Sequence, residues 1–126
     1  MILGIGVDVV EVERVEKAAG KFSGRFLRRV FTSGELTYCR RRADFGRCLA
    51  ARFAAKEAVL KALGTGLAGG LRWVDIEVVA GSSPGAPEVL LRGKAAARAE
   101  EKGVARVHLS MAHGERVAIA FVILEG

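Results

Sequence analysis

The sequence lacks a hydrophobic run long enough to cross a membrane. No apolar stretch in its 126 residues approaches the ~20 residues that a membrane-spanning helix needs. The N-terminal stretch Met1–Gly6 has no basic leader and no cleavage signal, so it does not resemble a signal peptide. We therefore expect a cytoplasmic protein that does not bind a membrane.

Cysteine is scarce, with only Cys39 and Cys48 in the chain. Their spacing matches no zinc-binding or redox motif. Because cytoplasmic proteins rarely hold disulfides, we expect two free thiols.

Acidic residues are nearly missing from the segment between Lys21 and Arg52, where only Glu35 and Asp44 occur. The whole chain has a net charge of +6, and this segment holds much of the excess. Its basic residues are Lys21, Arg25, Arg28, Arg29, Arg40, Arg41, Arg42, Arg47 and Arg52. Such a block indicates an anionic partner, which could be nucleic acid, a phosphate-rich small molecule or an acidic protein. The alternative is a solvated helical face without a partner.

What is present is a globular composition, with 51% hydrophobic and 27% charged residues and no internal repeat. We predict one domain over residues 1–126, of the α+β class. Thr32 and Glu35 have the spacing of a capping box. The predicted strands are 2–12, 73–80, 88–91, 105–112 and 116–124, with a turn at 81–87 and a hairpin at 113–115. The predicted helices are 11–19, 24–31, 32–42, 47–63 and 93–102.

The helix predicted over 47–63 contains one residue that breaks its pattern. Glu57 lies in the same row as Leu49 and Phe53, which should face the core. A carboxylate there is costly unless it is paired or binds a cation. The simplest explanation is a surface pair with Lys61, one turn later. The other is a functional site.

A second unexpected carboxylate, Asp8, lies in the first predicted strand. Gly4, Gly6 and Asp8 share one face of that strand, so a ligand or another backbone could approach closely. The alternative role of Asp8 is a helix cap, although Val9 and Val10 continue the strand pattern.

Two other features are weaker signals. Gly64, Gly66 and their neighbours form a glycine-rich loop that lacks the ending of a P-loop. His108 and Ser110 share a strand face, where a histidine is either structural or catalytic. Nothing in the spacing indicates a Ser-His-Asp triad.

Four stretches together resemble one family, the holo-acyl-carrier-protein synthases, which are small bacterial phosphopantetheinyl transferases. The stretches are Gly4–Glu11, Arg52–Ala58 continuing through Lys61–Gly66, Asp75–Val78, and His108–His113. The resemblance covers essentially the whole chain. It implies an antiparallel sheet packed against a long helix and shorter helices. It also implies transfer of 4′-phosphopantetheine from coenzyme A to a serine of acyl carrier protein, with release of adenosine 3′,5′-bisphosphate, in support of fatty acid biosynthesis.

The resemblance also implies roles for single residues. Asp8 and Glu57 would be the ligands of a catalytic Mg²⁺, which explains both carboxylates at once. Lys61 would reach a phosphate, and the turn formed by Gly64, Thr65 and Gly66 would contact the ligand through its backbone. Arg52, His108 and Ser110 would lie near the nucleotide of coenzyme A. The base that takes the serine proton would be Glu57 or a metal-bound water.

The same resemblance gives the basic segment a partner. Acyl carrier protein is strongly acidic, and the family binds it at the region that matches Arg14, Lys21, Phe22, Arg25 and Phe26, although the phenylalanines could instead be core residues. The family is trimeric with active sites between subunits, so His108 would meet the metal site of a neighbour. Some relatives have an acid after the histidine matching His113, where this chain has Gly114.

The competing function class is a small basic nucleic-acid-binding module. It explains the arginine block, because lysine and arginine neutralise phosphates. It leaves Asp8 and Glu57 unexplained, and the chain contains no recognised nucleic-acid-binding motif.

Overall fold

The structure, a computed structural model, describes residues 1–21, 24–81 and 86–126 and has the predicted α+β class. Its strands are β1 (Ile2–Glu11), β2 (Ile76–Ala80), β3 (Pro87–Leu91), β4 (Arg106–His113) and β5 (Val117–Glu125). Its α-helices are α1 (Val12–Ala19), α2 (Arg25–Val30), α3 (Ser33–Arg40), α4 (Phe45–Leu63) and α5 (Gly93–Lys102). Short 3₁₀ turns occur at η2 (Ala68–Gly70) and η3 (Trp73–Asp75). None of the helices in these ranges is long and apolar enough to cross a membrane.

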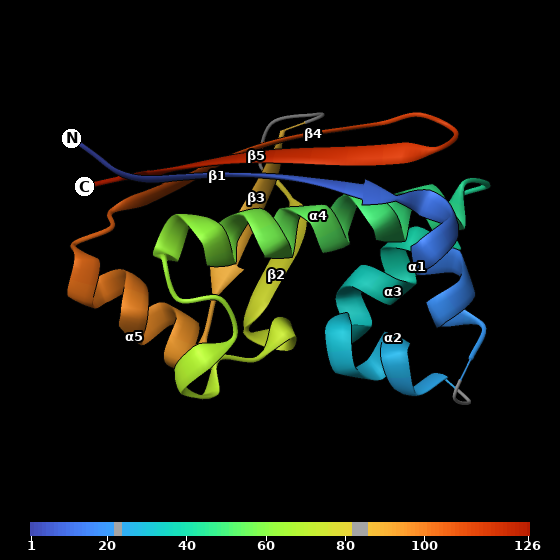
Figure 1. The fold of residues 1–126 in the computed structure, drawn as a ribbon, viewed down its shortest axis with the longest axis horizontal. Helices are drawn as coiled ribbons and strands as arrows, with labels where there is room; N and C mark the ends of the chain where they lie inside the picture. Colours follow the sequence, from blue (N-terminus) through green and yellow to red (C-terminus); the bar gives the residue numbers. More distant parts are fainter. Residues whose placement is uncertain (22–23, 82–85) are drawn as a thin grey trace.

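A three-stranded antiparallel sheet forms one layer, in the order β1-β5-β4. The helix α4 runs along one face of this sheet (Figure 1). The strands β2 and β3 form a separate antiparallel pair that crosses behind α4, with β2 against α4 and β3 reaching β4 (Figure 1). The two chain ends meet, because the Gly126 amide donates to the Met1 carbonyl at 2.9 Å. The predicted arrangement of a sheet against a long helix is confirmed.

The glycines of β1 allow the strand to lie directly on α4. A Cβ atom on Gly4 would overlap the Ala62 carbonyl oxygen, and one on Gly6 would overlap that of Ala58. The small side chains of Ala58 and Ala62 on α4 also permit this close approach, and both residues are buried. Of the two partners considered for the glycine face, the structure therefore shows another backbone rather than a ligand.

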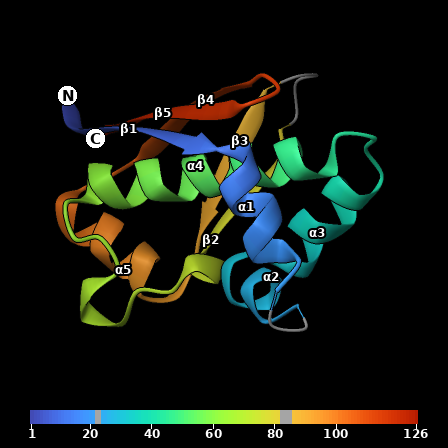
Figure 2. The same ribbon diagram turned by 45° about the vertical axis from the view of Figure 1, so that its right-hand side comes forward.

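The shorter helices surround α4 in two groups. The helices α1, α2 and α3 gather around its N-terminal half, and α5 lies beside its C-terminal half (Figure 2). The predicted capping box begins α3, with the Glu35 amide donating to Thr32 Oγ1 and the Thr32 amide donating to Glu35 Oε1. The other oxygen of Glu35 accepts from the Val78 amide at 2.8 Å, which ties α3 to β2.

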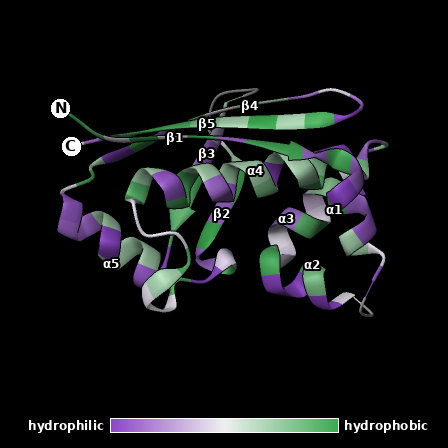
Figure 3. Ribbon diagram, in the orientation of Figure 1, coloured by the Kyte–Doolittle hydropathy of each residue, from purple (hydrophilic) through white to green (hydrophobic). Residues whose placement is uncertain are grey.

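The opposite face of the sheet is apolar and exposed. Ile5 and Val9 of β1 are 60% and 59% exposed, and on β5 the exposed Phe121 pairs with Val7 and the exposed Ile119 pairs with Val9. Figure 3 shows hydrophobic colouring along β1 and β5 on this outer layer. We call this surface, formed by Ile5, Val7, Val9, Val117, Ile119 and Phe121, the outer sheet face.

One predicted strand begins too early. Residues 73–75, assigned to a strand over 73–80, form the turn η3, and β2 begins at Ile76. The reason is the buried Asp75, whose amide donates to the Arg72 carbonyl and whose carboxylate pairs with the Arg72 guanidinium at 2.8 Å. These Arg72–Asp75 contacts form a turn, so the backbone becomes extended only after Asp75. The predicted turn at 81–87 falls largely on residues outside the described ranges.

Two helix boundaries differ from the predictions by two residues, and the other helix ends agree to within one. The helix α3 ends at Arg40 rather than Arg42, and α4 begins at Phe45 rather than Arg47, with Asp44 as its N-cap. Both shifts are within the usual uncertainty of helix ends.

The prediction of free thiols is wrong. Cys39 of α3 and Cys48 of α4 form a disulfide, with their Cα atoms 5.6 Å apart and both side chains buried. The short connection between the helices folds α4 back against α3, so the two cysteines face each other. The spacing of nine residues did not reveal this, because the contact depends on how the two helices pack.

Candidate functional site

Asp8 and Glu57, the two unexpected carboxylates, line one pocket. The strand β1 supplies Asp8 near its C-terminal end, and the middle of α4 supplies Glu57. The cavity has a volume of about 330 Å³ and is also lined by Arg14, Phe26 and Phe53. We call it the carboxylate pocket. The structure thus brings the two carboxylates to one pocket, and their role as metal ligands stays a prediction.

Lys61 pairs with Asp8, one of the residues that line this pocket. Its Nζ atom donates to Asp8 Oδ1 at 2.8 Å and to the Val7 carbonyl at 3.0 Å. The surface pair considered for Glu57 and Lys61 is therefore replaced by a pair between Lys61 and Asp8. Partial burial raises the pKa of Glu57, the negative charge of Asp8 raises it further, and Lys61 opposes the change. The hydrogen bond to Asp8 raises the pKa of Lys61.

The residues expected to dock a carrier protein lie around the same pocket. Arg14 and Phe26 line it directly. Phe26 also packs on Phe53, with ring centroids 6.1 Å apart, so it is both a core residue and part of the pocket wall. Lys21 and Arg25 are exposed nearby, at the end of α1 and the start of α2. Phe22 lies outside the described residues.

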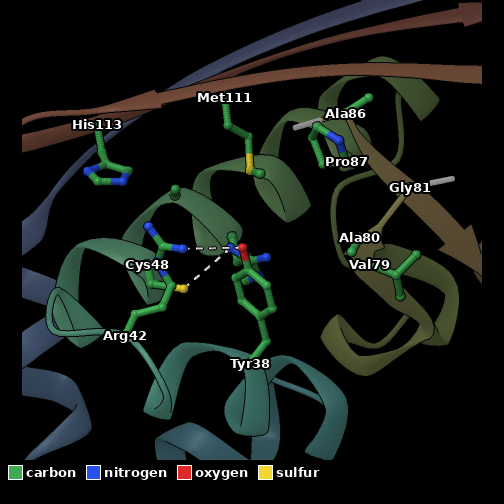
Figure 4. Close-up of a pocket in the computed structure, with 12 residues that line it drawn as sticks. Tyr38, Arg42, Cys48, Val79, Ala80, Gly81, Ala86, Pro87, Met111 and His113 are labelled. Carbon is green, nitrogen blue, oxygen red and sulfur yellow. Dashed lines mark hydrogen bonds between the residues drawn. The ribbon is translucent and has the colours of Figure 1, made fainter. Parts of the chain in front are cut away.

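A second pocket lies between α3, α4 and the ends of β2, β3 and β4. Its volume is about 300 Å³, and its polar lining consists of Tyr38, Arg42, Arg52 and His113. Figure 4 shows Tyr38 rising from α3 and His113 hanging from β4 above Arg42. We call it the arginine pocket.

Arg52 is the buried cation of the arginine pocket. It is 7% exposed, and its guanidinium carbon lies 4.3 Å from the centre of the Tyr38 ring. One of its nitrogens donates to Cys48 Sγ at 3.4 Å, a weak acceptor, and its Nε has no partner among the described residues. Burial lowers the pKa of Arg52. A buried guanidinium without a carboxylate contact favours an anionic ligand.

The other expected site residues do not join either pocket. His108 and Ser110 lie on exposed positions of β4, and His108 Nε2 is 3.0 Å from Glu125 Oε1. Their Cα partners on β5 are Ile123 and Phe121, so both residues continue the outer sheet face. Gly64, Thr65 and Gly66 follow the end of α4, where Gly64 and Gly66 have positive φ angles.

The sequence did not single out Arg42, Tyr38 or His113 as site residues. Arg42 was one of a run of three arginines, and His113 ended the matched stretch His108–His113. Neither the run of arginines nor the matched stretch predicts which arginine and which histidine share a pocket with Arg52. That choice depends on how β4 packs across α4.

Comparison with known proteins matches residues 4–122 to the model of the 4′-phosphopantetheinyl transferase superfamily. A relative from Anaeromyxobacter sp. (strain K), a holo-[acyl-carrier-protein] synthase, is 54% identical and covers 100% of this chain and 98% of its own length.

Two solved structures of the same kind of enzyme are similar throughout. The synthase of Neisseria meningitidis has a TM-score of 0.89 and 37% identity, with 100% of both chains covered. The synthase of Helicobacter pylori, solved in complex with coenzyme A, has a TM-score of 0.81 and 31% identity, covering 96% of this chain and 99% of its own.

These matches extend over the whole fold and confirm the resemblance found in the sequence. They decide against the alternative of a nucleic-acid-binding module. The chain belongs to the 4′-phosphopantetheinyl transferase superfamily and, within it, to the holo-[acyl-carrier-protein] synthases.

Proposed function

We propose that this chain, as a single domain over residues 1–126, moves 4′-phosphopantetheine from coenzyme A to a serine of acyl carrier protein. The products are the loaded carrier and adenosine 3′,5′-bisphosphate, in a cytoplasmic step that supports fatty acid biosynthesis. The main support is the carboxylate pocket, where Asp8 and Glu57 meet beside Lys61 and Arg14. The family of the chain and the coenzyme A complex of a relative give the substrates.

Mg²⁺ fits the donors of this pocket, and we propose Asp8 and Glu57 as its protein ligands. Both are carboxylates, the donors that a hard cation prefers. Within the described ranges no group of three or more His, Cys, Asp and Glu side chains gathers. Two carboxylates suffice, because magnesium is commonly completed by substrate phosphates and water. A bound magnesium would supply charge neutralisation for the diphosphate and the leaving group.

The residues of the chain would position the reacting groups. The serine oxygen forms a bond to the phosphorus that carries pantetheine, and the bond from that phosphorus to the bridging oxygen breaks, so the electron pair leaves with adenosine 3′,5′-bisphosphate. Lys61 is exposed enough to turn from Asp8 toward a phosphate oxygen. Glu57, whose pKa lies above its usual value, is the candidate acceptor of the serine proton on this chain.

We assign the phosphorylated nucleotide of coenzyme A to the arginine pocket. The buried, incompletely partnered Arg52 supports this assignment, together with Arg42 and His113 at the same cavity. Guanidinium groups bind phosphate through paired hydrogen bonds. His113, rather than His108, lines this cavity together with Arg52. Gly64, Thr65 and Gly66 stay candidate backbone contacts to the ligand.

We propose that one coenzyme A molecule bridges two subunits of a homotrimer. Glu57 follows Arg52 by five positions, which places them about 140° apart around α4. The two pockets of one chain therefore open on different sides of the helix. The exposed apolar outer sheet face supports association, since exposed patches of this kind are typical of interfaces. His108 and Ser110 border that face and would lie near a neighbouring subunit.

The docking of acyl carrier protein belongs around Arg14, Lys21, Arg25 and Phe26. Arg14 and Phe26 line the carboxylate pocket, and Lys21 and Arg25 are exposed, so an acidic carrier bound there would bring its serine to the metal ligands. Nearby positive charges should chiefly raise the association rate.

Mass spectrometry of apo acyl carrier protein tests the function. The carrier is incubated with the protein, coenzyme A and Mg²⁺, and a gain of one phosphopantetheine is expected together with free adenosine 3′,5′-bisphosphate. The gain should disappear with EDTA and with Asp8→Asn, whereas Glu101→Gln on the distant helix α5 should act like the natural protein. An unmodified carrier would refute the proposal.

A further inference from the structure

Asp44 contacts two of the polar side chains that line the arginine pocket. Its Oδ1 lies 3.0 Å from Arg42 Nε, and its Oδ2 lies 3.6 Å from His113 Nε2. The two contacts come from different elements, since Arg42 precedes α4 and His113 ends β4. One carboxylate thus contacts two of the polar side chains that line the pocket, and Arg52 is left with the Tyr38 ring and Cys48 Sγ.

The side chain of Asp44 does not cap the helix that it precedes. It is the N-cap residue of α4, yet its side chain makes no capping hydrogen bond. An N-cap aspartate usually accepts from an amide in the first turn of its helix. The carboxylate therefore has a second favourable position close by, at the start of α4, if an anion takes its place on Arg42 and His113.

We propose that Asp44 is a built-in competitor for the phosphate that binds the arginine pocket. In the ligand-free protein it pairs with Arg42 and contacts His113, and it gives up these contacts when a phosphate takes its place. Asp44 thereby weakens the binding of coenzyme A and of the product, which eases release of adenosine 3′,5′-bisphosphate. This inference rests on the proposed function, because it takes the nucleotide phosphate as the anion of this pocket.

The geometry makes the effect specific to one phosphate. Competition acts only on the anion that meets Arg42 and His113, which we assign to the 3′-phosphate. The penalty should therefore be larger for coenzyme A than for dephospho-coenzyme A, which lacks that group. The preference for coenzyme A over dephospho-coenzyme A is then smaller than Arg42, Arg52 and His113 would give without Asp44.

The test is calorimetric titration of adenosine 3′,5′-bisphosphate, coenzyme A and dephospho-coenzyme A into Asp44→Asn. Asparagine keeps the shape and is an equally good N-cap, so the fold should be retained. The matched control is Glu101→Gln, which changes the net charge equally on the exposed surface of α5. Asp44→Asn should bind adenosine 3′,5′-bisphosphate about five-fold more tightly, the size expected for removing one partly solvated charge at contact distance.

In Asp44→Asn the preference for coenzyme A over dephospho-coenzyme A should also rise. Glu101→Gln should change neither the affinity for adenosine 3′,5′-bisphosphate nor this preference. The gain should shrink in an Arg42→Gln background, since Asp44 acts largely through that guanidinium. Equal or weaker binding by Asp44→Asn overturns the inference while leaving the function intact. If the natural protein does not distinguish the two ligands at all, the placement of the phosphate fails, and the inference fails with it.

Discussion

At the scale of residues, the carboxylate pocket holds an arrangement that favours ligand binding over stability. Asp8 and Glu57 face the same cavity, and the one nearby lysine pairs with Asp8. Burial and the neighbouring Asp8 raise the pKa of Glu57, so ionising it costs free energy in the folded state. A divalent cation would relieve this cost.

Glu57→Gln should therefore stabilise the metal-free protein while removing its activity. A raised folded pKa means that the folded state binds protons more strongly, so the Glu57 charge begins to lower stability as the pH rises past its ordinary unfolded pKa. The gain in melting temperature should be seen at pH 8 and vanish below pH 4, where both states carry the proton. Transfer should fall by roughly 10²-fold or more, as for loss of an acid–base group.

Thermal melts at the two pH values and the mass-spectrometric transfer assay measure both effects, with Glu101→Gln as the control. If Glu57→Gln melted at a lower temperature than the natural protein at pH 8, the Glu57 charge would not be destabilising. Undiminished transfer would remove Glu57 from the site.

The sequence predicted Asp8 and Glu57 because each breaks the pattern of its own element. Arg42, Tyr38 and His113 break no pattern, and only the packing of α3, α4 and β4 brings them together. The same applies to Cys39 and Cys48, whose bridge depends on two helices folding back on each other. Residues that are unusual locally can be found from sequence, whereas those made important by tertiary contacts cannot.

At the scale of elements, α4 is held in its rotational setting by a buried ion pair on the side away from the sheet. Lys56 Nζ lies 2.8 Å from Glu35 Oε1, and both side chains are fully buried. The same ammonium donates to the carbonyls of Trp73 and Ile76. This network joins α3, α4 and β2 and fixes which way the adjacent Glu57 points.

Lys56→Met should lower the free energy of unfolding by about 3–5 kcal/mol, because it leaves the Glu35 carboxylate buried without its cation. The double variant Glu35→Gln, Lys56→Met should recover part of this loss, since no buried charge remains. Urea unfolding monitored by circular dichroism gives the free energy of unfolding of both variants. If Lys56→Met alone lowered the free energy of unfolding by less than the double variant, the pairing of Lys56 with Glu35 would be contradicted.

The element predictions succeeded where pattern and caps agree. The capping box of α3 and the glycine after α5 marked helix ends correctly. The strand predicted over 73–80 failed at its start, because the Arg72–Asp75 interaction closes a turn that alternation of side chains cannot reveal.

At the scale of the whole molecule, positive charge and the carboxylate pocket share one surface. Arg25 is exposed on α2, next to Phe26 of the pocket wall. A strongly acidic carrier would be attracted there over distances that salt screens, about 10 Å at 0.1 M.

Arg25→Glu should lower kcat/KM for acyl carrier protein about three- to ten-fold at low salt and by less at high salt. Coenzyme A affinity should stay the same, since Arg25 lies outside the arginine pocket. Lys94→Glu on α5 makes the same change in charge at an exposed position and serves as the control. A matching loss of coenzyme A affinity would assign Arg25 to the nucleotide site instead of the docking surface.

The central claim is that the carboxylate pocket of one subunit and the arginine pocket of another serve one coenzyme A molecule. It is tested by mixing two inactive variants, Asp8→Ala and Arg52→Gln, under conditions that exchange subunits, and measuring phosphopantetheine transfer. Some interfaces then combine an intact Asp8 from one chain with an intact Arg52 from the other, so activity should return in part. A mixture of Asp8→Ala and Glu57→Ala should stay inactive, because every carboxylate pocket is then damaged. No recovery in proven mixed oligomers of Asp8→Ala and Arg52→Gln would contradict a site shared between subunits.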